Sequence, residues 1–337
     1  MADRFPSAPQ MRDSPPWGAG NDRGEVGMVS IVRGMLLLAI SAGIIPAAFA
    51  QAVPSFMSFQ QTEKLADGLY AFRQGAYRSL FLVGKEGVIV TDPVSPKFAK
   101  AFRAEIAKIT DQPVRYVVYS ESHWDRISGG QIFKDEGAKF VAQQRCADNL
   151  RETPHPDVVP PDITYDQSYR VALGDQALDL HYFGPSLDTC LSVLVAQPAK
   201  MMMIVNLVIP PVAGVPWNPT IPDYHLYNLL PFFRSVEDLA KREGIDTVIG
   251  GFIAAGVGRD GKPFLQPSTG PVSVVTEQRI FWEKLMGAVK AQLDAGTPPR
   301  EIIRKIDLTQ FSSYPRYSER SIEILTRRIA SLYITGR

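Results

Sequence analysis

The chain has 337 residues, of which 45% are hydrophobic and 21% are charged. This is the composition of a globular protein that can bury a large core, and a formal net charge of +1 argues against a nucleic-acid groove or a polybasic membrane surface. The two cysteines, Cys146 and Cys190, do not form a Cys-x-x-Cys motif, which excludes zinc ribbons and multi-disulfide scaffolds. The sequence leaves open whether they pair with each other.

The N-terminal region has the pattern of a targeting segment. Residues 1–27 are rich in Pro, Gly, Asp and Arg without periodicity, which indicates disorder or an incorrectly assigned start. Residues 28–50 contain a basic residue, an apolar stretch at 35–45 and a small-x-small cleavage site, and they are predicted to be a signal peptide. An uncleaved anchor is the alternative, although the apolar stretch is short for a bilayer. We expect a periplasmic or secreted protein without a membrane span after cleavage.

Residues 53–337 are predicted to alternate between strands and helices. Short apolar or alternating runs predict strands at 69–73, 79–83, 87–91, 114–119, 139–141, 169–173, 177–182, 191–196, 201–208 and 247–249. Helical spacing of apolar residues predicts helices at 98–109, 143–151, 224–242, 276–293, 299–305 and 317–332. Because no break in composition separates these elements, we expect one α/β domain of sandwich type that includes the C-terminal helices.

Polar residues follow the predicted strand at 114–119. Residues 119–130 read YSESHWDRISGG, which brings carboxylate, imidazole and hydroxyl groups together before a glycine pair and a segment that permits a helix. A strand that ends in such groups is a common way to build a functional site. We therefore expect the site of this protein at residues 119–130.

This stretch resembles the H-x-H-x-D-H metal-binding motif of the metallo-β-lactamase superfamily. The motif's second histidine and its aspartate are retained as His123 and Asp125, whereas Glu121 and Arg126 stand where the first and last histidines are expected. The resemblance extends over nearly all of residues 53–337, with matching segments at 79–92, 180–195, 203–208 and 248–252. It implies an αβ/βα sandwich, in which two mixed β-sheets lie face to face with helices outside.

The resemblance also identifies the superfamily's other metal-ligand positions, and none of them holds the usual residue. Leu187 stands at the loop histidine, Asn206 at the bridging aspartate and Phe252 at the final histidine. The full dinuclear site needs five histidines, and this chain has four, namely His123, His155, His181 and His225. The usual dinuclear zinc site therefore cannot form in any register.

Arg126 is expected to replace the second metal with a permanent positive charge. A buried carboxylate needs a partner, so we predict a buried pair between Arg126 and Asp125. A neutral amide at Asn206 costs less to bury than an unbalanced carboxylate would. The apolar Leu187 and Phe252 would fill the remaining ligand space.

The first metal position leaves two alternatives open. Glu121 and His123 are two residues apart on an extended segment, so their side chains point the same way. With Asp188 as a third ligand they could hold one divalent metal, iron or manganese in preference to zinc. Otherwise Glu121 and His123 form a hydrogen bond without any metal. No cofactor is expected under the second alternative.

Two functions follow from these alternatives. Without a metal, the protein is a hydrolase-like pseudoenzyme that binds a ligand or a partner without catalysis. With a single atypical metal on Glu121, His123 and Asp188, it is an active hydrolase in which His123 and Asp125 are the catalytic residues.

The expected ligand is a small anion such as a carboxylate, sulfate or phosphate. Arg126 would bind it together with backbone N–H groups at Ser128 and Gly129, and Trp217 on a Pro/Gly-rich loop would cover an apolar part of it. The sequence indicates neither a substrate nor an oligomeric state.

Overall fold

The computed structural model describes residues 59–216, 218–220, 224–252, 255–257, 263–265 and 267–336. The predicted signal peptide, the residues before it and Trp217 lie outside the described residues. Within the described ranges, no helix combines the length and the apolar character that crossing a membrane requires.

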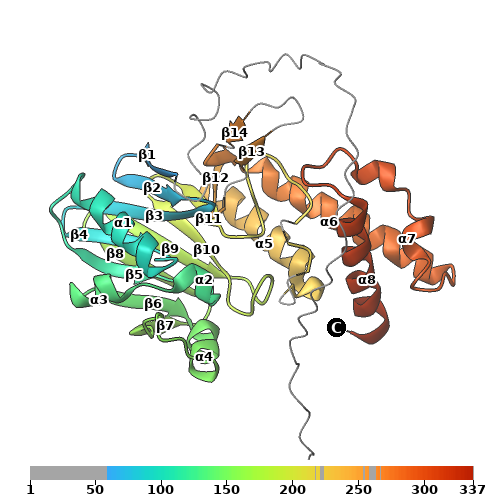
Figure 1. Cartoon of the computed structure of the whole chain (residues 1–337), viewed down its shortest axis with the longest axis horizontal. Helices are drawn as coiled ribbons and strands as arrows, with labels where there is room; N and C mark the ends of the chain where they lie inside the picture. Colours follow the sequence, from blue (N-terminus) through green and yellow to red (C-terminus); the bar gives the residue numbers. More distant parts are fainter. Residues whose placement is uncertain are drawn as a thin grey trace, which may run out of the picture. The chain divides into compact units, whose positions relative to one another are not determined.

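The first seven strands of the described chain form one mixed sheet in sequence order (Figure 1). Its strands are β1 (Gln60–Ala66), β2 (Leu69–Gln74), β3 (Tyr77–Gly84), β4 (Gly87–Thr91), β5 (Val114–Val118), β6 (Lys139–Gln143) and β7 (Ile163–Tyr165). Strands β1 to β4 form an antiparallel meander, and β4 to β7 run parallel. The parallel connections contain α1 (Pro96–Ala107), α2 (Trp124–Ile127), α3 (Gln131–Asp135) and α4 (Gln144–Glu152).

The second sheet has the strand order β15-β12-β11-β10-β9-β8. Its strands are β8 (Ser168–Leu173), β9 (Gln176–Tyr182), β10 (Ser192–Gln197), β11 (Met201–Ile204), β12 (Thr247–Gly250) and β15 (Thr269–Pro271). Helix α5 (Leu226–Glu243) connects β11 to its parallel neighbour β12. Strands β13 (Ala255–Val257) and β14 (Pro263–Leu265) form a separate hairpin.

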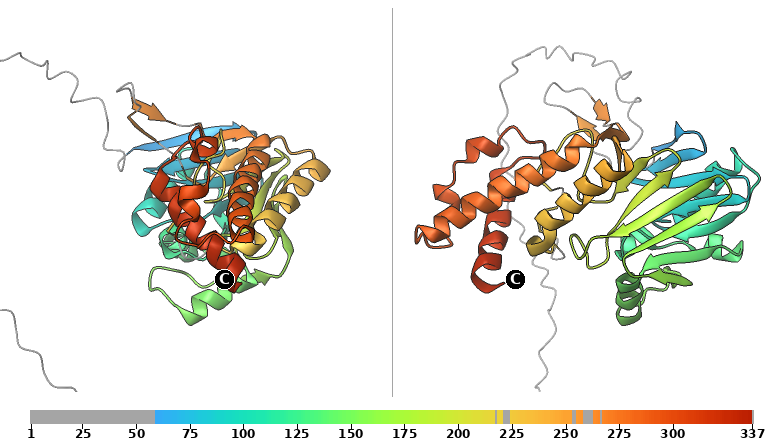
Figure 2. Two further views of the ribbon diagram at one scale, coloured as in Figure 1. Left: turned by 90° about the vertical axis from the view of Figure 1, so that its right-hand side faces the viewer. Right: turned by 180° about the vertical axis from the view of Figure 1, so that it is seen from behind.

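The two sheets lie face to face with a hydrophobic core between them (Figure 2). Leu80 and Leu82 of β3 belong to this core together with Leu178 and Leu180 of β9. Their alternation along each strand follows the two-residue period of a pleated sheet. The other face of the first sheet is covered by α1, and rings of the sheet and the helix stack there, as in the Phe72–Phe102 pair.

Helices cover the outer side of the second sheet as well. Helix α5 packs with α6 (Ser273–Asp294), and α7 (Ile302–Lys305), the 3-10 turn η3 (Leu308–Phe311) and α8 (Glu319–Thr335) follow along the chain (Figure 1). Side chains of α5, α6 and α8 belong to the same core as the inner sheet faces. The predicted αβ/βα sandwich of two mixed sheets with C-terminal helices is confirmed.

Candidate functional site

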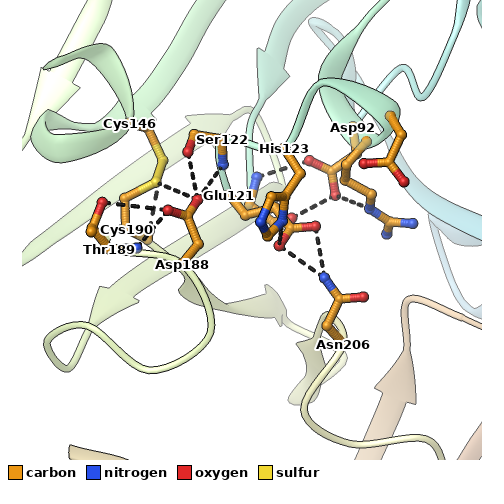
Figure 3. A network of polar contacts seen from close by, with 12 residues as sticks. Asp92, Glu121, Ser122, His123, Cys146, Asp188, Thr189, Cys190 and Asn206 are labelled. Carbon is orange, nitrogen blue, oxygen red and sulfur yellow. Dashed lines mark hydrogen bonds and ion pairs between the residues drawn. A yellow bond between two sulfur atoms is a disulfide. The ribbon is translucent and has the colours of Figure 1, made fainter. Parts of the chain in front are cut away.

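The polar network of the 119–130 stretch forms where several strands end. Asp92 follows β4, Glu121 and His123 follow β5, and Asn206 follows β11 (Figure 3). The backbone turns sharply at these exits, because Asp92 and Asn206 have φ values of 34° and 68°, and Asp188 in the loop before β10 has 61°. Asp and Asn tolerate this left-handed region better than other side chains do.

Glu121 is the centre of the network, and its side chain is almost fully buried. His123 Nδ1 lies 2.9 Å from Oε2, and the Asn206 amide donates to Oε1 and Oε2 at 2.9 and 2.8 Å. Burial raises the pKa of Glu121, and the nearby His123 and Arg126 oppose this rise. The prediction that Glu121 and His123 point the same way is confirmed. Both oxygens of the carboxylate are therefore engaged by protein groups.

Arg126 is completely buried, and each of its three guanidinium nitrogens has an acceptor. Nε lies 3.2 Å from Asp92 Oδ2, Nη1 donates to the carbonyl of Gly251 at 3.0 Å, and Nη2 donates to that of Arg78 at 2.7 Å. The Phe252 ring lies 5.2 Å from the guanidinium carbon. A Cβ at Gly251 would meet Nη2 at 2.8 Å, so glycine is required for this close approach.

Asp92 is the partner of Arg126 that the sequence analysis missed. The Ser120 backbone N–H and hydroxyl each donate to its carboxylate at 2.8 Å. Burial raises the pKa of Asp92, and the Arg126 charge and the Ser120 hydrogen bonds oppose the rise. The available signal was topological: β4 and β5 are parallel neighbours, so the residues after them share one sheet edge.

The predicted buried pair between Asp125 and Arg126 is wrong. Asp125 is exposed and accepts a hydrogen bond from the Tyr77 hydroxyl at 2.9 Å. Burial raises the pKa of Tyr77 to about 12, and the Asp125 charge adds to the rise. Consecutive residues of a helix do not face each other, so in α2 the two side chains leave in different directions.

The Asp188 carboxylate accepts hydrogen bonds from Ser122 and Thr189 and does not join Glu121 and His123. Its Oδ2 accepts from the Ser122 backbone N–H at 2.8 Å and from the Ser122 hydroxyl at 2.5 Å, while Oδ1 accepts from the Thr189 N–H (Figure 3). The Asn149 amide of α4 contacts Asp188, Ser122 and Thr189. These contacts join the strand exit after β5 to the loop before β10.

Cys146 and Cys190 form a disulfide with Cα atoms 5.3 Å apart, which settles the question that the sequence left open. In the described part of the chain, Cys146, Asp188 and Cys190 are the one group of at least three side chains whose potential ligand atoms lie within 4.8 Å of one another. Oxidised sulfur atoms are not the thiolates that bind metals, so this group is not a metal site. The structure does not bring Glu121, His123 and Asp188 together within that distance.

The anion cradle predicted at Arg126, Ser128 and Gly129 is not formed. The Gly129 N–H donates to the carbonyl of Asp157 at 2.6 Å, and the Ser128 N–H donates to that of Trp124 at 3.0 Å. Gly129 has φ 87°, and a Cβ there would lie 2.2 Å from the Ser95 carbonyl carbon. Close packing therefore accounts for this glycine, and neither N–H group is available to a ligand.

The residues at the superfamily's metal positions do not fit a dinuclear zinc centre. Leu187 is fully buried and offers no ligand atom, and the amide of Asn206 is turned so that its donor faces Glu121. Arg126 brings a cation with donors only, and Phe252 brings an aromatic ring. Zinc is bound by lone pairs of nitrogen, oxygen or sulfur. Leu187, Arg126 and Phe252 offer none, and Asn206 directs its NH2 group rather than its oxygen at Glu121.

A shallow pocket with a volume of about 650 Å³ opens beside the network. It is lined by Ser122, His123, Trp124, Asp125, Asn149, Glu152, Thr153, Asp188 and Thr189. Trp124 is 43% exposed, and its ring packs against that of His155 with 4.7 Å between the ring centroids. The described residues of the lining include three carboxylates and neither Lys nor Arg, so they give no support to an anionic ligand.

Comparisons with known proteins support the fold at low sequence identity. No family model and no curated protein sequence matches the chain. The structure is similar to the metallo-β-lactamase from Pontibacter korlensis, with a TM-score of 0.54, 17% identity, and coverage of 67% of this chain and 99% of that one. It is similar to the DIM-1 metallo-β-lactamase, with a TM-score of 0.54, 15% identity, and coverage of 67% and 98%.

A longer enzyme covers more of this chain. The sec-alkylsulfatase Pisa1 from Pseudomonas sp. has a TM-score of 0.63 and 13% identity, and the match covers 83% of this chain and 51% of that one. At these identities the similarity concerns the fold, and it carries over neither an activity nor a metal site. The resemblance predicted from residues 119–130 is confirmed at this level: the chain has the fold of the metallo-β-lactamase superfamily.

Proposed function

We propose that this protein is a hydrolase-like pseudoenzyme of the metallo-β-lactamase fold, in which protein groups replace the dinuclear metal centre and the site binds a ligand without catalysis. The observation that carries the proposal is the position of Asn206. Its amide donates to both oxygens of Glu121, at 2.9 and 2.8 Å. An acceptor at this position, as an aspartate would be, would face Glu121 with a second negative charge.

The network is complete without an added cation. The buried carboxylate of Asp92 is balanced by Arg126, and the buried carboxylate of Glu121 is bound by His123 and Asn206. A buried charge is tolerated when it is paired and hydrogen-bonded. A metal at Glu121 would compete with the Asn206 amide for the carboxylate oxygens, and the loss of the two Asn206 hydrogen bonds would oppose binding.

The pocket beside the network supports ligand binding. Its volume of about 650 Å³ lies within the range of small-molecule sites. Trp124 offers an exposed aromatic face, and Asp125 and Glu152 offer acceptors. We propose a small neutral or cationic polar molecule as the ligand here, because an aromatic face beside carboxylates favours positive charge. Arg126 has no part in this binding, since its nitrogens already have acceptors.

The metal content of the purified protein tests the proposal. Protein that is secreted with its own N-terminal segment and purified without chelators should contain well under one equivalent of zinc, iron or manganese by mass spectrometry. Added zinc should leave its melting temperature unchanged. The Asn206→Asp variant is the matched comparison, because it restores an acceptor beside Glu121 and should gain metal-dependent stability if any variant does.

Two results would contradict the proposal. Two tightly bound zinc ions per chain would show that Arg126, Leu187 and Phe252 do not block the usual centre. One bound iron or manganese, lost in Glu121→Gln and His123→Ala but retained in Asp125→Asn, would instead support the single-metal hydrolase.

A further inference from the structure

Two buried arginines lie directly opposite each other on neighbouring strands. Arg73 of β2 is in register with Arg78 of β3, and their relative exposures are 4% and 1%. Residues in register on adjacent strands project from the same face of a sheet. This is the face of Ala71 and Leu80, which belong to the core between the sheets. Like charges in this arrangement destabilise a sheet unless something compensates them.

Arg78 uses only part of its hydrogen-bonding capacity. Its Nη1 donates to the carbonyls of Gly250 and Ser268 at 2.5 and 3.2 Å. Among the described residues, its buried Nε and Nη2 have no hydrogen-bond partner, and neither does the buried Nε of Arg73. In a guanidinium, Nε and Nη2 form one edge with two parallel N–H groups, which is the edge that binds an oxyanion in a bidentate manner. The whole of this edge of Arg78 is unsatisfied.

The charges around the pair are also unbalanced. Glu63 of β1 pairs with Ala71 and so projects from the same face. It accepts a hydrogen bond from the Ser268 hydroxyl, and in the described part of the chain it forms no ion pair with Arg73 or Arg78. Counted over the residues that the structure describes, these two guanidiniums and this carboxylate leave one positive charge. Burial lowers the pKa of Arg78 to about 9. The charge of Glu63 opposes this lowering, and the charges of Arg73 and Arg126 add to it.

The neighbouring Arg126 shows what a compensated arginine looks like in this structure. Each of its nitrogens has an acceptor, and Asp92 balances its charge. Its Nη2 donates to the carbonyl of Arg78, so the two arginines are close in space but differ in their partners. An unpaired buried guanidinium is costly, which calls for a partner of opposite charge.

We infer that Arg73 and Arg78 form a binding site for one small oxyanion, such as phosphate, sulfate or a carboxylate, which the Nε/Nη2 edge of Arg78 holds. A single negative charge neutralises the group, and two acceptor oxygens match the free edge. The sequence analysis expected an anion at Arg126. The oxyanion proposed here would lie at Arg73 and Arg78 instead, in a site separate from the Trp124 pocket, for which a neutral or cationic ligand is proposed. The inference does not rest on the proposed function, since the guanidiniums of Arg73 and Arg78 take no part in the metal-replacing network.

Calorimetry and thermal unfolding with inorganic phosphate, sulfate and acetate test the inference, with chloride at equal ionic strength as the reference. At neutral pH the protein should bind about one equivalent of at least one of these oxyanions and show a saturable rise in melting temperature that chloride does not give. In Arg73→Gln and Arg78→Gln the affinity should fall about tenfold or more, because charge-assisted hydrogen bonds are lost. Arg170→Gln on β8, where Arg170 is exposed and paired with Asp179, is the matched control and should bind like the original protein.

Glu63→Gln keeps the test decisive if Arg78→Gln does not fold. This change removes the competing carboxylate and should strengthen oxyanion binding, which a nonspecific salt effect would not do. The absence of saturable binding by the original protein would overturn the inference and would mean that water alone occupies this edge. Binding that persists unchanged in Arg73→Gln, or that Glu63→Gln leaves unchanged, would overturn it as well.

Discussion

Arg126 forms its ion pair with Asp92, which lies 34 residues earlier in the chain, and not with the adjacent Asp125. Both partners are fully buried, and Asp125 is exposed. The pair therefore connects the exit of β4 to α2. It fixes the position of α2 through buried charge.

We expect Arg126→Met to lower the free energy of unfolding by about 3 kcal/mol or more, because removing one partner of a buried ion pair leaves the other charge uncompensated. Asp92 would then be buried without its cation. Urea denaturation of the original protein and the variant measures the change.

The companion variants identify the partner. Adding Asp92→Asn to Arg126→Met should restore part of the loss, because the stranded carboxylate is then neutral. Asp125→Asn should cost less than about 1 kcal/mol, since an exposed hydrogen bond contributes little. If Asp125→Asn is as costly as Asp92→Asn, the assignment of the ion pair is wrong.

The sequence predicted most of the fold because periodicity reports buried faces. The β8–β9 hairpin and helices α1, α5, α6 and α8 were predicted close to their observed bounds. Strand β1 was missed because its residues, QQTEKLA, are mostly polar and half-exposed at a sheet edge. The predicted strand at 201–208 ends early, at Ile204. The chain turns two residues later, at Asn206, whose backbone has a left-handed conformation.

The site was predicted less completely, because its contacts join distant residues. The Glu121–His123 hydrogen bond is local and was one of the two alternatives that the sequence left open. The contacts of Asn206 with Glu121 and of Asp92 with Arg126 join residues 85 and 34 positions apart in the chain. Patterns in a single sequence do not show which distant residues meet in space. Pairing Arg126 with its neighbour in sequence ignored the direction of side chains on a helix. The parallel order of β4 and β5 was the missing information.

The Asn206 amide provides a second prediction. Asn206→Asp replaces a donor to both oxygens of Glu121 with a second carboxylate, so we expect a loss of about 2 kcal/mol or more at pH 7 in the absence of metal. The loss should shrink at acidic pH, where two adjacent carboxylates share a proton. Asn206→Ala removes the donor without adding charge, and its smaller loss should depend less on pH. Denaturation of both variants at two pH values compares them, and equal losses at every pH would contradict the repulsion.

The pH dependence of Glu121 gives a third prediction. Burial raises its pKa in the folded protein above the usual 4.5. The folded state therefore disfavours the ionised form, and the contribution of Glu121 to stability falls as pH rises from the unfolded pKa through the higher folded one. Relative to Glu121→Gln, the original protein should lose stability across this window and then level off. The raised pKa of Asp92 acts in both proteins and cancels in the difference.

Urea denaturation of the original protein and Glu121→Gln in steps from about pH 4 to pH 8 measures this difference. A difference that does not change with pH would show that His123 and Asn206 fully compensate the burial of Glu121. A rise of the original protein's relative stability with pH would mean that the folded pKa is lowered instead.

The disulfide provides the last prediction. Cys146 and Cys190 close a loop with a sequence separation of 44, and chain-entropy arguments assign about 4 kcal/mol to a crosslink of this length. Cys146→Ala combined with Cys190→Ala should therefore melt well below the oxidised protein. Because both cysteines are buried, reductant should act slowly on the folded protein and fully once it is unfolded. Reduced original protein and the double variant should then unfold alike, since both lack the crosslink between α4 and the Asp188 loop. Equal melting of the oxidised protein and the double variant would show that the hydrogen bonds of Asn149 and Asp188 hold this loop by themselves.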